Sequence, residues 1–179
     1  MSDWISGNYT LSLEQMQQNA MGFSLRMLGA GWSPTAIAAV LGNMQAESTI
    51  NPGRWEGGVP YKGGYGLVQW TPYTKYSEWW GPGWENNGDA QCERILWEVA
   101  NGEQWFANPQ APIVNPPLSF AEFTHSGEDV KTLANYFLWF YEHPEITIQP
   151  QRGKNAVYWL GFVLAILHKR KKTTLSPFV

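Results

Sequence analysis

Glu47 is the residue of this sequence whose position best suits acid catalysis. It occupies the last turn of a helix predicted from Ser33 to about Ser48, and it lies ten residues after Ile37, at the border of the apolar stripe. Apolar neighbours and the negative end of the helix dipole both disfavour an ionised carboxylate there. A carboxylic acid that keeps its proton near neutral pH can protonate the leaving oxygen of a glycosidic bond. The alternative is a solvated Glu at a helix end with no catalytic role.

Amide, hydroxyl and aromatic side chains follow Glu47 in an order that suits a sugar-binding cleft. Residues 52–88 hold nine Gly, four Pro and five Trp, a composition in which all five indole rings are hard to bury. Trp and Tyr rings stack on the apolar faces of pyranose rings, and amides hydrogen-bond hydroxyl and acetamido groups. Core packing is the alternative role for the tryptophans. The residues that we expect to bind sugar or position water are Ser48, Asn51, Tyr65, Gln69, Trp79 and Trp80.

The segment from Tyr65 to Trp70 predicts one short strand after the Gly63-Gly64 turn, half of a small hairpin. Side chains alternate between the two faces of a strand. If Gln69 faces the sugar, Tyr65 and Leu67 share its face and Trp70 points into the core. Sugar stacking is then left to Trp79, Trp80 or Trp55.

Apolar residues at steps of three and four predict the helices that position this segment. A capping box at Ser12–Gln15 opens the first helix, and Ser33-Pro34 opens the second. Further helices are expected from 89 onward, over 129–141 and over 153–168. The sequence therefore predicts a mainly helical α+β fold with a small β-hairpin region. One domain is expected over residues 1–168, with 169–179 as a basic tail or the start of a linker.

Charge and apolar runs exclude two classes of partner. Of the twelve Lys and Arg residues, four lie in Lys169–Lys172, so residues 1–168 carry 8 basic against 15 acidic groups, a net charge of −7. A body this acidic is a poor nucleic-acid binder. The longest apolar run, Val157–Leu167, has eleven residues, whereas a membrane span needs about 20. We therefore expect no nucleic acid and no membrane span.

Two segments together resemble a known family. Gly42-Asn-Met-Gln-Ala-Glu-Ser-Thr-Ile-Asn-Pro-Gly53 and Gly64-Tyr-Gly-Leu-Val-Gln-Trp-Thr-Pro72 are similar to the phage tail lysozyme family, and the resemblance runs from about Leu13 to Trp159. It includes Phe140-Tyr-Glu-His-Pro144, and the Glu-Ser and Gly-Leu-x-Gln pairing also resembles goose-type lysozymes and lytic transglycosylases.

The resemblance implies a function, a place of action and partners. It implies a lysozyme-like fold in which Glu47 is the general acid and the β-1,4-linked glycan of peptidoglycan is the substrate. It places the protein in a virion tail, acting outside the cell at the bacterial wall, with other phage tail proteins as partners. The lack of a secretory signal fits this expectation. No cofactor is implied.

The sequence does not identify a second catalytic group. Glycosidases usually need two carboxylates, but no Asp or Glu lies between Gly57 and Ser77, and only Glu56 and Glu78 flank that stretch. Water held by Gln69 would give hydrolysis, which the family favours. Attack by the substrate's own 6-hydroxyl would give an anhydro product, as in lytic transglycosylases. Glu142 and Arg152 are interpreted as a structural tie between the last two helices.

Other classes of protein remain as alternatives. A cysteine amidase or endopeptidase would use Cys92 with His125 or His143, but Cys92 shares an apolar stripe with Ile95 and predicts a buried, inert thiol. The three histidines are scattered and no metal site is expected. A non-catalytic glycan-binding module, in which Glu47 only accepts hydrogen bonds, is the remaining alternative.

Overall fold

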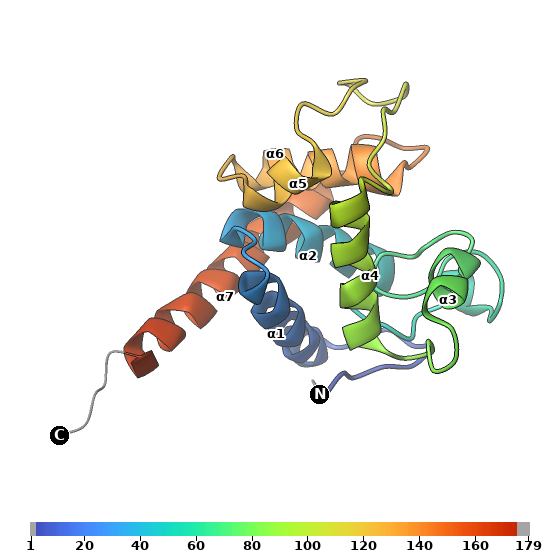
Figure 1. Cartoon of the computed structure of the whole chain (residues 1–179), viewed down its shortest axis with the longest axis horizontal. Coiled ribbons are helices and arrows are strands. Elements are labelled where there is room, and N and C mark those ends of the chain that lie inside the picture. Colours follow the sequence, from blue (N-terminus) through green and yellow to red (C-terminus); the bar gives the residue numbers. More distant parts are fainter. Residues whose placement is uncertain (1–2, 175–179) are drawn as a thin grey trace.

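The computed structural model describes residues 3–174, and these form a mainly helical domain (Figure 1). This confirms the predicted helical character. Two short irregular helical turns, the 3-10 turn η1 (Glu56–Gly58) and the π-helical turn η2 (Leu138–Glu142), accompany the α-helices. The seven α-helices of the described residues are α1 (Leu13–Gly29), α2 (Pro34–Ser48), α3 (Thr74–Trp80), α4 (Gly88–Asn101), α5 (Phe120–His125), α6 (Val130–Phe137) and α7 (Pro150–Thr174).

Helix α2 crosses the middle of the molecule, with α1 on one side and α5 and α6 on the other (Figure 1). Every residue from Ala36 to Met44 is buried, because this stretch is apolar except for Asn43, whose side chain donates a hydrogen bond to a backbone carbonyl of α6. The Ser33 hydroxyl accepts a hydrogen bond from the Ala36 amide, and Pro34 takes the first helical position, as predicted. Glu47 is thus carried at the end of a rigid, fully packed element.

Helices α2 and α7 approach each other closely at Gly42. A Cβ atom built on Gly42 would lie 2.7 Å from the Ala156 nitrogen and 2.7 Å from the Arg152 carbonyl oxygen. Only glycine allows the two backbones to come this near. The close approach brings the first turns of α7 over the C-terminal half of α2, where Glu47 lies.

The helix boundaries follow the sequence pattern, except that α3 and α5 are additional helices, α6 ends at Phe137 rather than 141, and α7 is longer than predicted. The capping box at Ser12 is present, and α6 begins after Asp129 as predicted. Helices α3 and α5 were not predicted, because seven and six residues are too few for a periodic pattern to stand out. Helix α7 begins at Pro150 rather than 153 and continues past 168 to Thr174.

The predicted strand from Tyr65 to Trp70 is wrong. Tyr65 and Trp70 instead pair with each other through two backbone hydrogen bonds of 3.1 and 3.3 Å, and the residues between them form a tight turn. Gly66 has φ +85° and Gln69 has φ +51°, so the chain reverses where a strand would run straight. Isolated bridges of Tyr65 to Trp55 and Trp70 are the only β-pairing within the described part of the chain, and the small hairpin is not confirmed.

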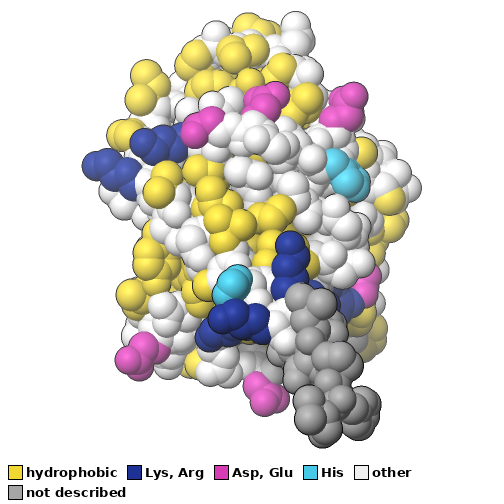
Figure 2. All heavy atoms as spheres, turned by 90° about the vertical axis from the view of Figure 1, so that its left-hand side faces the viewer, with side chains coloured by type: hydrophobic (Ala, Val, Ile, Leu, Met, Phe, Trp, Pro, Cys, Tyr) yellow, Lys and Arg dark blue, Asp and Glu magenta, His cyan; other side chains and the backbone are white. Residues whose placement is uncertain are grey.

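The basic residues near the C-terminus belong to α7. The side chains of Lys169–Lys172 are exposed, and Figure 2 shows Lys and Arg side chains gathered beside the C-terminal end of the chain. Residues 175–179 of the predicted tail lie outside the described residues. Among residues 3–174, no helix combines the length and the apolar character that a membrane crossing requires.

We predict that Gly42→Ala destabilises the protein by about 1–3 kcal/mol, because the added methyl group meets the backbone of α7 and the helices must move apart. The midpoint of urea unfolding measures this. Gly29→Ala is the matched control, since a Cβ there meets nothing within 4 Å, and its midpoint should stay or rise. Equal midpoints for Gly42→Ala and the wild type would contradict the account of the α2–α7 contact.

Candidate functional site

Glu47 lines a cavity of about 300 Å³, here called the Glu47 cavity. A second cavity of about 320 Å³, here called the Lys75 cavity, lies beside it. Gln69, Thr71 and Glu142 line both, so the two cavities meet at these side chains. The other residues of the Glu47 cavity are Arg54, Trp55, Glu56, Gly57 and Pro144. Together the cavities form a groove with carboxyl groups at its middle.

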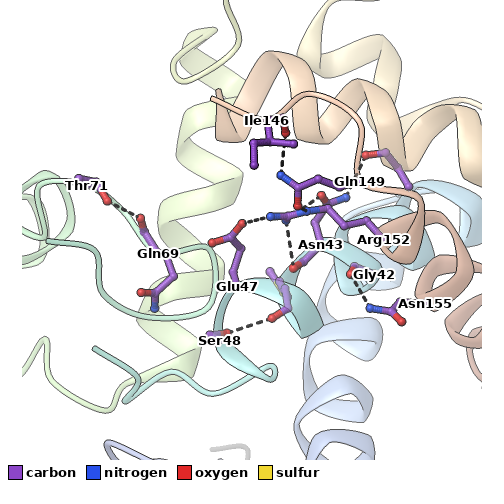
Figure 3. Close-up of polar contacts among 12 residues, drawn as sticks. Gly42, Asn43, Glu47, Ser48, Gln69, Thr71, Ile146, Gln149, Arg152 and Asn155 are labelled. Carbon is purple, nitrogen blue, oxygen red and sulfur yellow. Dashed lines mark hydrogen bonds and ion pairs between the residues drawn. The ribbon is translucent and has the colours of Figure 1, made fainter. Parts of the chain in front are cut away.

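The Glu47 carboxylate forms an ion pair with the Arg152 guanidinium of α7 (Figure 3). The Arg152 side chain is only 7% exposed, and that of Glu47 is 21% exposed. Arg152 also donates from Nε to Gln149 Oε1 at 2.7 Å and from Nη1 to Asn43 Oδ1 at 3.1 Å. The guanidinium is therefore held from three sides, and it fixes Glu47 with one oxygen paired and the other facing the groove.

Glu142 lies at the end of η2, on the groove wall contributed by the segment after α6. The structure corrects the interpretation of Glu142 and Arg152 as a tie, because Arg152 pairs with Glu47. Glu142 Oε1 is enclosed and has no hydrogen-bond partner among the described residues. Burial raises the pKa of Glu142 well above its usual range, and the charge of Glu47 raises this pKa further, whereas Arg152 lowers it.

Glu98 connects the two walls of the groove from beneath. This carboxylate on α4 is fully buried, and it accepts hydrogen bonds from the Trp70 indole at 2.9 Å and from the Tyr141 hydroxyl at 2.6 Å. Arg94 adds an ion pair at 2.8 Å. Burial raises the pKa of Glu98, and these hydrogen bonds and Arg94 lower it in part. Because Trp70 follows Gln69 and Tyr141 precedes Glu142, one buried carboxylate positions both walls.

Gln69 lines the groove, but its amide nitrogen is turned toward its own loop. It donates to the carbonyl oxygens of Arg54 at 3.0 Å and of Gly66 at 2.8 Å. Figure 3 shows Gln69 and Thr71 across the groove from Glu47. Gln69 and Trp70 differ in burial as expected, since Trp70 is 2% exposed and Gln69 is half-buried. The predicted alternation is wrong, because Tyr65 and Leu67 are buried with Trp70 rather than exposed with Gln69.

Three of the expected sugar-binding residues lie in the interior. Ser48 donates to the Leu67 carbonyl at 2.9 Å, which joins the end of α2 to the turn. Asn51 donates to the carbonyls of Gly7 and Tyr9, each at 2.7 Å. The Tyr65 hydroxyl accepts from the Asn86 amide at 2.7 Å, and burial raises the Tyr65 pKa to about 12. Each is at most 1% exposed, so these side chains shape the site but do not face a substrate in this structure.

Of the three tryptophans left for sugar stacking, Trp79 and Trp80 lie outside the two cavities. Trp79 on α3 packs near Trp97 and under the Arg94 guanidinium, 5.3 Å from the ring centre. Trp80 is 39% exposed beside it, and neither residue lines the Glu47 or the Lys75 cavity. Trp55 is the tryptophan that lines the Glu47 cavity, where it packs against Tyr65 and Tyr61.

Cys92 is fully buried on α4, as predicted. Burial raises the pKa of its thiol far above the ordinary value, so the reactive thiolate is disfavoured. The structure thus argues against a cysteine nucleophile. Across residues 3–174, no three His, Cys, Asp or Glu side chains gather in a way that would hold a metal ion.

The model of the phage tail lysozyme family matches residues 18–163 of the chain. The chain belongs to this family. Morphogenesis protein 1 of Bacillus phage B103 is 44% identical over 164 residues, which cover 86% of this chain. The chain spans 41% of the length of that relative. The family match includes Glu47, the Gln69 turn, Glu142 and Arg152, and so contains the whole groove.

The sequence did not predict a role in the site for Glu142, which lines both cavities, or for Glu98, which lies buried beneath the groove. The sequence pattern indicates a structural pair for Glu142 and contains no catalytic motif at Glu98. Glu98 shares the buried side of α4 with Ile95 and Cys92. A carboxylate at such a position is unusual, and this is the signal by which the sequence could have indicated Glu98.

We predict that Trp70→Ala mainly lowers stability and that Gln69→Ala mainly lowers activity. Trp70→Ala removes a buried ring and a hydrogen bond to Glu98, and should cost about 3–5 kcal/mol of unfolding free energy. Gln69→Ala loses two hydrogen bonds of the turn, about 1–2 kcal/mol, and should reduce wall lysis while the fold survives. Urea unfolding measures the stability of each variant, and lysis is compared at a temperature where both variants are folded. A larger loss of stability for Gln69→Ala than for Trp70→Ala would contradict the prediction.

Cys92→Ser should leave lysis nearly intact and lower stability modestly, because a hydroxyl replaces a thiol in an apolar site. Lysis of purified walls and thermal unfolding are the two measurements. Abolished lysis at an unchanged melting temperature would support the cysteine peptidase alternative instead.

Proposed function

We propose that this domain degrades peptidoglycan by cleaving the β-1,4 linkages between the amino sugars of its glycan strands. The observation that carries the proposal is the meeting of Glu47 and Glu142 in one groove, inside the segment that matches the phage tail lysozyme family. Cleavage of a glycoside needs carboxyl groups on the two sides of the bond, or one carboxyl group and an internal nucleophile. A groove that contains both Glu47 and Glu142 supports the first arrangement.

The rest of the groove suits an extended sugar chain. The Glu47 cavity and the Lys75 cavity lie on the two sides of Glu142, so a strand that fills both passes the carboxyl groups at its middle. Trp55 offers an aromatic edge in the Glu47 cavity, and Gln104 and Lys75 offer polar groups in the other. These features favour an enzyme over a module that only binds glycan.

Two carboxyl groups also favour hydrolysis over formation of an anhydro sugar. Attack by water requires a group that removes its proton, and the second carboxyl group can do this. Mass spectrometry of muropeptides released from purified sacculi decides between them. New reducing ends support hydrolysis, anhydro-muramic ends support a lytic transglycosylase, and new amino termini with intact glycan would overturn the proposal.

The place of action follows from the same family. We infer that the domain works in a virion tail at the bacterial cell wall, where it opens the wall for the tail, with other tail proteins as partners. The printed name of the Bacillus phage B103 relative, a morphogenesis protein, is consistent with a virion protein.

Glu47→Gln should remain folded, with lower stability because Arg152 loses its charged partner, and should lose wall lysis by roughly 10²-fold or more, because the amide can neither give nor take the proton that bond cleavage moves. The control is Glu14→Gln, which changes an exposed Glu of α1 outside the groove and should keep full activity. Turbidity loss of purified walls measures lysis, and circular dichroism verifies the fold. More than half of the wild-type activity in Glu47→Gln would remove Glu47 from the mechanism.

A further inference from the structure

We propose that Glu142 is the second carboxyl group of the reaction, and that Glu47 and Glu142 enter it with one proton between them. This inference rests on the proposed function and assigns a role to a residue that sequence reasoning placed outside the site.

The first argument is the position of Glu142. It lines both cavities, whereas Glu47 lines one of them, so Glu142 lies where a bound chain passes from one cavity to the other. It ends a π-helical turn, and such turns are frequent at functional sites because they change the direction of a side chain. The next residue, His143, has φ +50°, so the chain turns away immediately after Glu142.

The second argument is the balance of charge. One guanidinium faces two carboxyl groups, and its hydrogen bonds go to Glu47, Asn43 and Gln149. Glu142 receives none of them, and its Oε1 is enclosed without a partner. An enclosed carboxyl oxygen without a partner, beside a second carboxylate, costs more when its group is ionised than when it is protonated. With one proton on the pair, the three groups sum to zero charge.

The third argument comes from the other charged groups that surround Glu142. Glu98 on α4 adds negative charge from below, and it raises the Glu142 pKa as Glu47 does. Positive charge comes from Arg152, which lowers this pKa, but burial is the largest influence. The remaining ionisable groups that line the two cavities are Lys75, His143, Tyr141, Arg54 and Glu56.

The proton has a defined path in the reaction. As the bond from C1 to the glycosidic oxygen breaks, its electron pair goes to that oxygen, which takes the proton of the carboxyl pair. The pair is then doubly ionised, and it accepts the proton of the water molecule whose oxygen bonds to C1. The pair therefore returns to its single-proton state after each turnover.

Glu142→Gln tests the proposal through the pH dependence of activity. The wild type should lose kcat/KM at high pH, when the pair loses its last proton. The variant lacks the carboxyl group whose pKa is raised by burial and by the charge of Glu47, so it should lose activity at lower pH than the wild type. We expect the alkaline limb to move down by at least ~1 pH unit and activity at pH 7 to fall by at least ~10²-fold.

Stability supplies a second readout that does not depend on activity. Gln has the shape of a protonated Glu, so Glu142→Gln should be at least as stable as the wild type at pH 7, and the difference should vanish below pH 4, where carboxyl groups are protonated in both folded and unfolded chains. The matched control is Glu145→Gln, an exposed carboxyl three residues away that lines neither cavity. It should change neither the pH profile nor the stability.

The outcomes separate this inference from the proposed function. A wild-type protein that leaves glycan strands intact overturns the function, whereas the stability comparison still tests the protonation of Glu142. If the wild type cleaves glycan but Glu142→Gln keeps the wild-type pH profile, with or without a uniform loss, the inference is wrong. Lower stability of Glu142→Gln than of the wild type at pH 7 would likewise overturn it.

Discussion

The buried guanidinium of Arg152 is the group on which the arrangement of the site depends. A cation with 7% exposure must be paired and hydrogen-bonded to remain charged, and its partners Asn43 and Glu47 lie one helical turn apart on α2. Asn43 also donates to the Ala134 carbonyl of α6 at 3.0 Å, so one cluster joins three helices. The close approach at Gly42 brings Arg152 within reach of these partners. The position of Glu47 is thus a consequence of how α2, α6 and α7 pack.

Most of the helical fold could be predicted from the sequence, because its signals are local. The hydroxyls of Ser12 and Ser33 mark the starts of α1 and α2, and apolar residues at steps of three and four mark their buried faces. The turn at Tyr65–Trp70 could not be predicted in this way. Its β-favouring residues indicate a strand, but Gly66 and Gln69 adopt positive φ values and Ser48 holds the Leu67 carbonyl. Tertiary contacts there overrule the local preference.

The site was predictable only where its residues lie close together in the chain. Glu47 and Gln69 belong to neighbouring segments whose composition indicates a cleft, and both line the Glu47 cavity. Glu142 and Arg152 come from about a hundred residues further along the chain than Glu47, and no local pattern shows which carboxylate Arg152 contacts. Burial was the other obstacle, because residue type alone does not distinguish an Asn that binds sugar from one that holds backbone carbonyls, as Asn51 does.

Glu98, which is fully buried, and Glu142, which has one enclosed oxygen, show that the groove is held at a cost to stability. Burial raises the pKa of both Glu98 and Glu142 above the values of an unfolded chain. The folded protein then binds protons more tightly than the unfolded one, so each group makes the protein less stable as pH rises through the range between its two pKa values. Apolar residues at these positions would avoid that loss. Glu98 accepts hydrogen bonds from Trp70 and Tyr141 and thereby sets the spacing of the two walls. Glu142, which lies between those walls, is an acidic group of the kind that the proposed glycoside cleavage requires.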